Sequence, residues 1–160
     1  MTGKILQPII ILVCITAGLA DPVDTAFDLM EAIEYNDGYA LEGLLTADLY
    51  SVLDGFIDQV RGIVETDPVL AEDLLSSRYG GTITLDDFAL LNNQEILGLA
   101  MSGISLQPMV YIESEEAQLQ GRSASVVIRY FDGSSVSFRM SWENSRWRVA
   151  DSSLLRFIFD

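Results

Sequence analysis

The stretch VVIRYFDGSSVSFRMSWENSRWRV, from Val126 to Val149, alternates apolar and polar side chains with a period of two. This alternation predicts antiparallel strands, each with one buried and one solvated face. The apolar positions on the two sides of residues 131–133 are Val126, Ile128 and Tyr130, then Val136, Phe138, Met140 and Trp142. Opposed residues share a face, so the loop between them must have an odd length. Phe131-Asp132-Gly133 meets this condition, with Gly133 in the left-handed region, and sets Val126 opposite Phe138.

The next strand places its apolar residues, Trp147 and Val149, at odd numbers. A two-residue turn at Asn144-Ser145 satisfies this change of parity. The pairing that results sets Trp142 opposite Trp147 on the buried face. We therefore expect the two tryptophans to be cross-strand neighbours in the core.

Upstream of this stretch, a two-residue turn at Gly121-Arg122 sets Leu119 opposite Ala124. Apolar residues nearer Met109 have the opposite parity, which requires a bulge near residues 114–116. The sequence therefore predicts a sheet over about 109–151 that is curved as well as twisted.

Residues of about 22–102 carry helix signals. Asp21-Pro22, Thr46 and Asp67-Pro68 are typical helix starts, and Thr84 with Asp87 has the spacing of a capping box. Apolar residues then recur every three or four positions. The predicted fold class is α+β, with N-terminal helices packed on a curved antiparallel sheet.

The first 20 residues are typical of a signal peptide. Lys4 supplies positive charge, residues 9–16 are apolar, and Gly18 and Ala20 suit a cleavage site. We expect cleavage before Asp21, which leaves one α+β domain over residues 21–160 in an exported protein, periplasmic or secreted. An uncleaved anchor and a lipoprotein acylated at Cys14 are the alternatives.

The charge composition excludes several classes of function. The chain has 9 basic and 24 acidic residues, a net charge of −15, and no histidine. Phosphate backbones and anionic membranes repel such a surface, so we expect neither nucleic acid nor, after cleavage, a membrane as partner. Histidine is the commonest zinc ligand and general base, and no carboxylate-rich calcium loop is present. We therefore predict no metal and no cofactor.

Two segments together carry a resemblance to a known family. Capped helices around an asparagine-aspartate-glycine corner, in residues 21–45, precede the meander of residues 121–150, which ends in Trp-Arg-Val. This order resembles the nuclear-transport-factor-2-like superfamily of cystatin-like α+β cones, which includes exported domains of unknown function. The resemblance implies a curved sheet wrapped on helices, often with an apolar pocket. It covers about half of the mature chain and specifies hairpins rather than chemistry.

Two sets of side chains are candidates for binding. A ligand pocket on the inner sheet face would be lined by apolar residues that otherwise form ordinary core: Phe27, Met30, Phe56, Met140, Trp142 and Trp147. The opposite face carries the arginines Arg129, Arg139 and Arg148. These predict either solvated ion pairs or an interface with a second copy or another acidic protein.

Two functions follow from these observations. The first is an exported, non-catalytic binding or interaction module, which could hold a small apolar ligand. The alternative is a small-molecule isomerase, dehydratase or hydrolase of the steroid-isomerase type. Without histidine, that enzyme would need a buried carboxylate next to a tyrosine. No spacing in the sequence selects such a pair, so we predict no catalytic residue.

Overall fold

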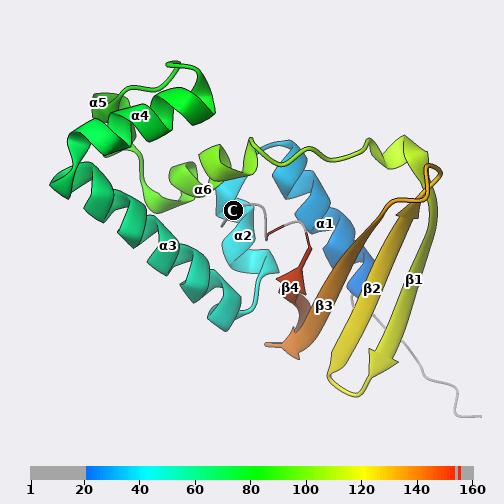
Figure 1. Cartoon of the computed structure of the whole chain (residues 1–160). Helices are drawn as coiled ribbons and strands as arrows, with labels where there is room; N and C mark the ends of the chain where they lie inside the picture. Colours follow the sequence, from blue (N-terminus) through cyan, green and yellow to red (C-terminus); the bar gives the residue numbers. More distant parts are fainter. Residues whose placement is uncertain (1–20, 154, 156–160) are drawn as a thin grey trace, which may run out of the picture.

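The computed structural model describes residues 21–153 and 155, so the predicted signal segment and its cleavage site lie outside the described residues. The described chain is α+β and begins with helices. The helices are α1 (Pro22–Glu34), α2 (Gly38–Leu44), α3 (Ala47–Thr66), α4 (Pro68–Tyr79), α5 (Leu85–Leu90), α6 (Asn93–Met101) and the short 3₁₀ helix η1 (Met109–Tyr111). The strands are β1 (Ile112–Gln120), β2 (Ser123–Tyr130), β3 (Ser135–Glu143) and β4 (Arg146–Ser152). Figure 1 shows the sheet on the right and α3, α4 and α5 on the left.

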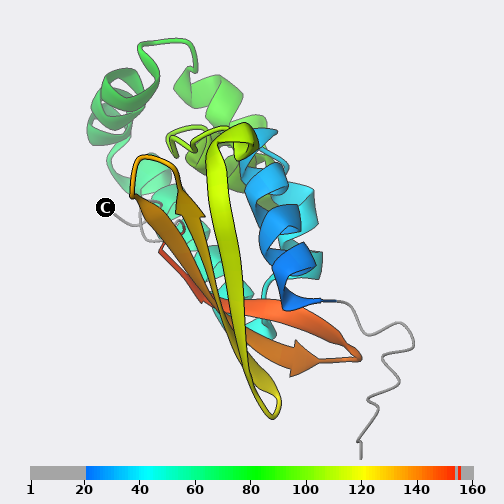
Figure 2. The same cartoon turned by 90° about the vertical axis from the view of Figure 1, so that its right-hand side faces the viewer.

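The four strands form an antiparallel sheet in the order β1-β2-β3-β4. The predicted register is confirmed, because Val126 pairs with Phe138 and Trp142 with Trp147. Gly133 lies in the left-handed region as predicted, with φ 85°. The predicted two-residue turn is present at Asn144 and Ser145, which have φ 50° and 64°. Figure 2 shows the strong twist that these strands share.

β1 is an edge strand that lies largely in solvent. Leu119 pairs with Ala124 as predicted, and the register shifts between Ile112 and Ser114, at the start of the predicted bulge. From Glu113 to Gln120 every residue is exposed, on both faces. On its outer edge, β1 pairs with no other strand in the described part of the chain.

The opposite edge of the sheet is covered. Leu45, just after α2, forms a parallel bridge with Val149 of β4. The backbone N–H of Thr46 donates to the carbonyl oxygen of Val149 at 2.9 Å. The segment between α2 and α3 therefore provides a hydrogen-bond partner for part of the backbone at the free edge of β4.

The predicted helix starts are confirmed by their caps. Asp21 accepts from the N–H of Val23, Thr46 from Leu49, and Asp67 from Leu70. At α5, Thr84 and Asp87 form the complete capping box. Each cap satisfies N–H groups that a helix start leaves without an intrahelical partner.

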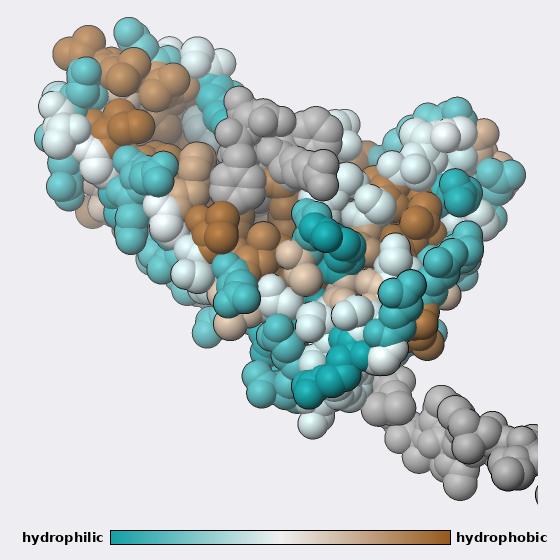
Figure 3. Space-filling view, turned by 60° about the horizontal axis from the view of Figure 1, so that its bottom comes forward, coloured by the Kyte–Doolittle hydropathy of each residue, from teal (hydrophilic) through white to brown (hydrophobic). Residues whose placement is uncertain are grey.

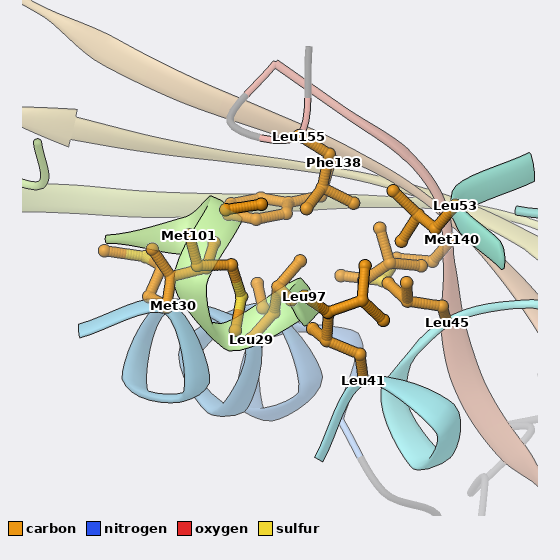
Figure 4. Packing of buried hydrophobic residues seen from close by; sticks show 14 of the residues in the cluster. Leu29, Met30, Leu41, Leu45, Leu53, Leu97, Met101, Phe138, Met140 and Leu155 are labelled. Atoms are coloured by element: carbon orange, nitrogen blue, oxygen red, sulfur yellow. The ribbon is translucent and has the colours of Figure 1, made fainter. Parts of the chain in front are cut away.

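The core lies between the sheet and the helices that cover its inner face. α1 contacts β1, β2 and β4, and α6 packs against α1 and α2. Figure 4 shows Met30 of α1, together with Leu97 and Met101 of α6, facing Phe138 of the sheet. All four side chains are at most 2% exposed. This interior is therefore closely filled by side chains.

α6 closely approaches the start of α2 and the turn before it, at two glycines. A Cβ atom placed on Gly98 would lie 2.4 Å from the carbonyl oxygen of Asn36. One placed on Gly38 would lie 1.8 Å from the carbonyl oxygen of Gln94. Both distances are shorter than a van der Waals contact, so only glycine fits at either position without a backbone shift.

The helices α3, α4 and α5 form a lobe that extends away from the sheet (Figure 1). α3 contacts β4 near its start and α4, α5 and α6 elsewhere. Among the described helices, none combines the length and the apolar character needed to cross a membrane.

Candidate functional site

The predicted ligand residues on the inner sheet face are mostly packed in the core. Met30, Met140 and Trp147 are 1%, 2% and 8% exposed. Phe27 and Trp142 are partly buried against the same cluster. The rings of Trp142 and Trp147 meet edge to face, with centroids 5.3 Å apart and planes at 71°. These five side chains therefore hold α1 against the sheet, which is the ordinary core role for an apolar face.

The sixth predicted ligand residue, Phe56, lies elsewhere. It lines a hollow of about 370 Å³ in the helical lobe, hereafter the helical hollow. Four helices supply the walls. The lining is Phe56, Val60, Ile63 and Val64 of α3, Ala71, Leu74, Leu75, Ser77, Arg78 and Tyr79 of α4, Phe88 of α5, and Ile96, Leu99 and Ala100 of α6. Figure 3 shows hydrophobic residues, in brown, on this lobe.

The hollow forms because α4 has more apolar surface than its neighbours cover. Ala71 and Leu75 are buried, but Leu74 at the hollow is 49% exposed. Leu70, one turn earlier and outside the hollow, is 46% exposed. Asp67-Pro68 begins α4 directly after α3, and Gly80, with φ 61°, ends it. The short connections keep α4 beside α3 and α5, where its apolar side chains face a partly filled space.

Polar groups around the hollow are few, and some are already paired. The hydroxyl of Tyr79 donates to the carbonyl oxygen of Leu99 at 3.4 Å, and burial raises the pKa of this tyrosine. Nearby, Arg61 donates to the carbonyl oxygen of Leu91 at 2.7 Å and ties α3 to the start of α6. Arg78 is the charged side chain in the lining. The walls are therefore suited to an apolar molecule.

A second depression, the polar cleft, lies beside α2 and the β3–β4 turn. It has a volume of about 610 Å³, and its lining includes Glu42, Tyr50, Asp54 and Arg146. Burial raises the pKa of Tyr50, with smaller contributions in the same direction from Glu42 and Asp54. The Tyr50 hydroxyl accepts from Gln94 at 3.4 Å.

The carboxylates of the polar cleft are not placed for acid–base work with Tyr50. Asp54 is partly exposed and accepts from the side chain of Asn93 at 2.7 Å. Glu42 is exposed. Within the described residues, neither carboxylate shares a hydrogen bond with the tyrosine hydroxyl. The described part of the chain also holds no group of three or more carboxylates or other ligand residues placed for a metal ion.

The three predicted interface arginines separate into two kinds. Arg129 lies on the exposed sheet face, 3.9 Å from Glu116, and Arg139 on the same face is 2.5 Å from Asp151. Arg148 instead donates to the carbonyl oxygens of Glu42 and Leu45 at 2.8 and 2.9 Å. It therefore holds the end of α2 against β4, while Arg129 and Arg139 form local surface pairs.

The helical hollow was only partly foreseen from the sequence. Phe56 of α3 is among the predicted ligand residues, but the sequence predicts that pocket on the inner sheet face and not between α3 and α4. In α4, apolar residues at 69, 70, 71, 74 and 75 cover more of the helix surface than one packed stripe requires. That excess was the signal in the sequence for an uncovered apolar surface.

Comparisons of this chain with models of protein families, with curated proteins and with solved structures find no match.

Proposed function

We propose that this protein is an exported, non-catalytic binding module that holds a small apolar ligand in the helical hollow. The observation that carries the proposal is a partly enclosed hollow of about 370 Å³ with predominantly apolar walls from four helices. Ligand sites in proteins typically occupy 300–1,000 Å³ and combine apolar walls with few polar groups. The hollow replaces the inner sheet face as the place of binding, because the side chains there are packed in the core.

The ligand chemistry follows from the lining. Tyr79 already has a hydrogen-bond partner, so the walls favour a molecule that needs few polar contacts. Arg78 at the hollow suits a ligand with one acidic or carbonyl group at its end. An uncharged or weakly acidic molecule of modest size fits these conditions.

The test compares two leucines on the same helix. Leu74→Gln changes the lining of the hollow, while Leu70→Gln changes a leucine of similar exposure outside it. The dissociation constant of the neutral dye Nile red is measured by fluorescence. Loss of one buried leucine contact, about 1.5–3 kcal/mol, should weaken binding roughly 10- to 100-fold in Leu74→Gln. Leu70→Gln should bind as the wild type does. Equal affinities in all three proteins would contradict the proposal.

Export belongs to this proposal and has its own test. The signal-like residues 1–20 support it, and N-terminal sequencing of protein recovered from outside the cytoplasm should find Asp21 first. Acylated Cys14 or a retained Met1 would point to anchoring instead.

We also propose a relation to the nuclear-transport-factor-2-like cones. The proposal is supported by the order of helices before a four-stranded meander and by α1 against the twisted sheet.

The alternative function, a carboxylate–tyrosine enzyme, has its best location in the polar cleft. Burial of the Tyr50 hydroxyl supports a protonated tyrosine there. Among the described residues, however, no contact joins Tyr50 to a buried carboxylate that could act as the base. The hollow therefore supports binding more directly than the cleft supports catalysis.

A further inference from the structure

β1 offers a long strand edge to solvent. The strand has 9 residues, Ile112–Gln120, and contains neither proline nor lysine, the residues that commonly blunt a free edge. Figure 1 shows it as the outermost strand of the sheet, on the right. In the described part of the chain no strand pairs with its outer side, so the N–H and C=O groups of alternate residues point outward there. The edge can therefore accept a further strand by backbone hydrogen bonds.

The side chains along β1 give this edge a pattern on the inner face of the sheet. Leu119 lies on that face, because it pairs with the buried Ala124 of β2. Glu115 pairs with the buried Ile128 and therefore lies on the same face. Leu119 is nevertheless 63% exposed, and every residue from Glu113 to Gln120 is exposed. A strand added beside β1 would place its own side chains next to these and cover the apolar side chain of Leu119.

The glutamates of β1 select the charge of an added strand. The carboxylate of Glu116 already has neighbours, because Arg129 lies 3.9 Å away and the side chain of Gln118 donates to it at 3.0 Å. Among the described residues, no ion pair and no side-chain hydrogen bond engages Glu113 or Glu115. Opposite charges directly across two strands stabilise the pairing, and like charges oppose it. The fitting partner is therefore basic, whereas a second copy would bring the same acidic edge.

We propose that β1 is a docking edge for an extended basic segment of another protein, which adds to the four-stranded sheet as a further strand. Antiparallel addition sets apolar residues of the segment opposite Leu119 and Ala117 and a basic residue opposite Glu115. The segment therefore has alternate residues that are apolar, apolar and basic, in that order along its chain. The net charge of −15 steers such a partner toward the protein. This inference does not depend on binding in the helical hollow.

The probe is the peptide Thr-Val-Thr-Val-Thr-Arg-Thr, blocked at both ends so that only its arginine carries charge. NMR titration of the ¹⁵N-labelled protein at low salt measures the dissociation constant, and hydrogen exchange of the β1 amides locates the contact. Two further peptides carry backbone N-methyl groups, one on the valines and the arginine, the other on the threonines between them. In an added strand only one of these two sets of N–H groups faces β1. One methylated peptide should therefore bind roughly tenfold more weakly than the other, since it loses several backbone hydrogen bonds.

The charge of the edge is tested with Glu115→Lys, and Glu72→Lys on the exposed surface of α4 is the matched control. Both variants change the net charge equally, but only Glu115→Lys sets a like charge opposite the arginine of the peptide. We expect binding to weaken about fivefold in Glu115→Lys alone. A peptide with glutamate in place of its arginine should bind Glu115→Lys more tightly than it binds the wild type.

Three results would overturn the inference. Equal binding of the two methylated peptides, weak or strong, would show that the backbone edge is not the contact. Equal weakening in Glu115→Lys and Glu72→Lys would show that the peptide responds only to net charge. Absence of binding would also overturn it, and slow exchange of the β1 amides in the free protein would then identify a strand of this chain or of a second copy as the occupant. None of these results changes the expected binding of Nile red, so the proposed function is tested separately.

Discussion

At the scale of single residues, the contact between α2 and α6 depends on a missing side chain. Gly98→Ala places a methyl group 2.4 Å from the carbonyl oxygen of Asn36. The obstacle is backbone, so the two helices must separate to admit it. We expect the free energy of unfolding to fall by about 1–3 kcal/mol, measured by urea denaturation.

The control for this prediction is Gly55→Ala, in the middle of α3. A Cβ at Gly55 meets nothing within 4 Å. Alanine in an open helix position should raise the free energy of unfolding by roughly 0.5–1 kcal/mol. If both variants raised the free energy of unfolding, this result would contradict the close approach described for α2 and α6.

Tyr130 supports a second prediction at the residue scale. Its side chain is 2% exposed, and its hydroxyl has no hydrogen-bond partner in the described structure. Burial, with a smaller contribution from Asp132, raises the pKa of this hydroxyl above its ordinary value of 10.0. A raised pKa means that the folded state holds the proton more tightly than the unfolded state. The stability it contributes is therefore complete below pH 10 and is lost as the pH rises through the folded-state pKa.

The measurement compares Tyr130→Phe with wild type by urea denaturation between pH 8 and about pH 11. At pH 8 the variant should unfold within about 0.5 kcal/mol of wild type, because phenylalanine keeps the ring and removes an unpaired hydroxyl. Above pH 10 it should lose less stability than wild type. A large loss at pH 8 would show that the hydroxyl has a partner after all.

At the scale of elements, the β3–β4 hairpin packs against the core with two tryptophans, Trp142 and Trp147. Trp147 is 8% exposed, so Trp147→Ala should lower the free energy of unfolding by about 3–5 kcal/mol. Trp142 is only partly buried, and Trp142→Ala should cost less. Phe131→Ala, on the exposed turn of the preceding hairpin, should change stability by no more than about 0.5 kcal/mol. If Trp147→Ala and Phe131→Ala lowered the free energy of unfolding by similar amounts, the burial of Trp147 in the core would be contradicted.

The sheet could be predicted in register because parity leaves few solutions. Each strand has one apolar face, and a slip of one residue would expose Phe138 and Met140 while burying Arg139. The turn residues Gly133 and Asn144 then fix the loop lengths. The helix starts could be predicted equally well, because a capping residue such as Thr46 bonds the backbone N–H of a residue only a few positions later.

The sequence was less informative where burial depends on distant elements. β1 pairs as predicted, yet Leu119 is 63% exposed because the described helices leave that end of the sheet uncovered. In α3, the sequence predicts a buried face of Leu49, Leu53, Phe56, Val60 and Ile63 or Val64, whereas the structure also buries Ile57 fully. The helical hollow was missed as a site for the same reason: the space between α3 and α4 depends on how four helices meet.

At the scale of the whole molecule, charge pairing on the sheet face bears on association. Each of Arg129 and Arg139 has a carboxylate of its own chain nearby, Glu116 and Asp151. Such surface pairs contribute about 0–1 kcal/mol, but they reduce the positive charge offered to a partner. We therefore expect the purified protein to sediment as a monomer at both 0.05 M and 1 M salt. The variant Arg129→Glu, Arg139→Glu should behave in the same way.

A dimer at low salt that dissociates at high salt and in the double variant would contradict this prediction. It would instead favour the interface with a second copy, because salt screens contacts between exposed charges. Arg122→Glu is the matched control, since that arginine sits at the β1–β2 turn and donates to the carbonyl oxygen of Trp142.

The uncovered edge of β1 has a consequence for the aggregation of this protein. A free strand edge is a template on which other chains can add as further strands and grow into fibrils. β1 carries Glu113, Glu115 and Glu116 along this edge, so two copies that meet there repel each other at neutral pH. High salt screens the repulsion between these exposed charges and removes that protection. The same strand that keeps the folded protein dispersed would then become the place where aggregation begins.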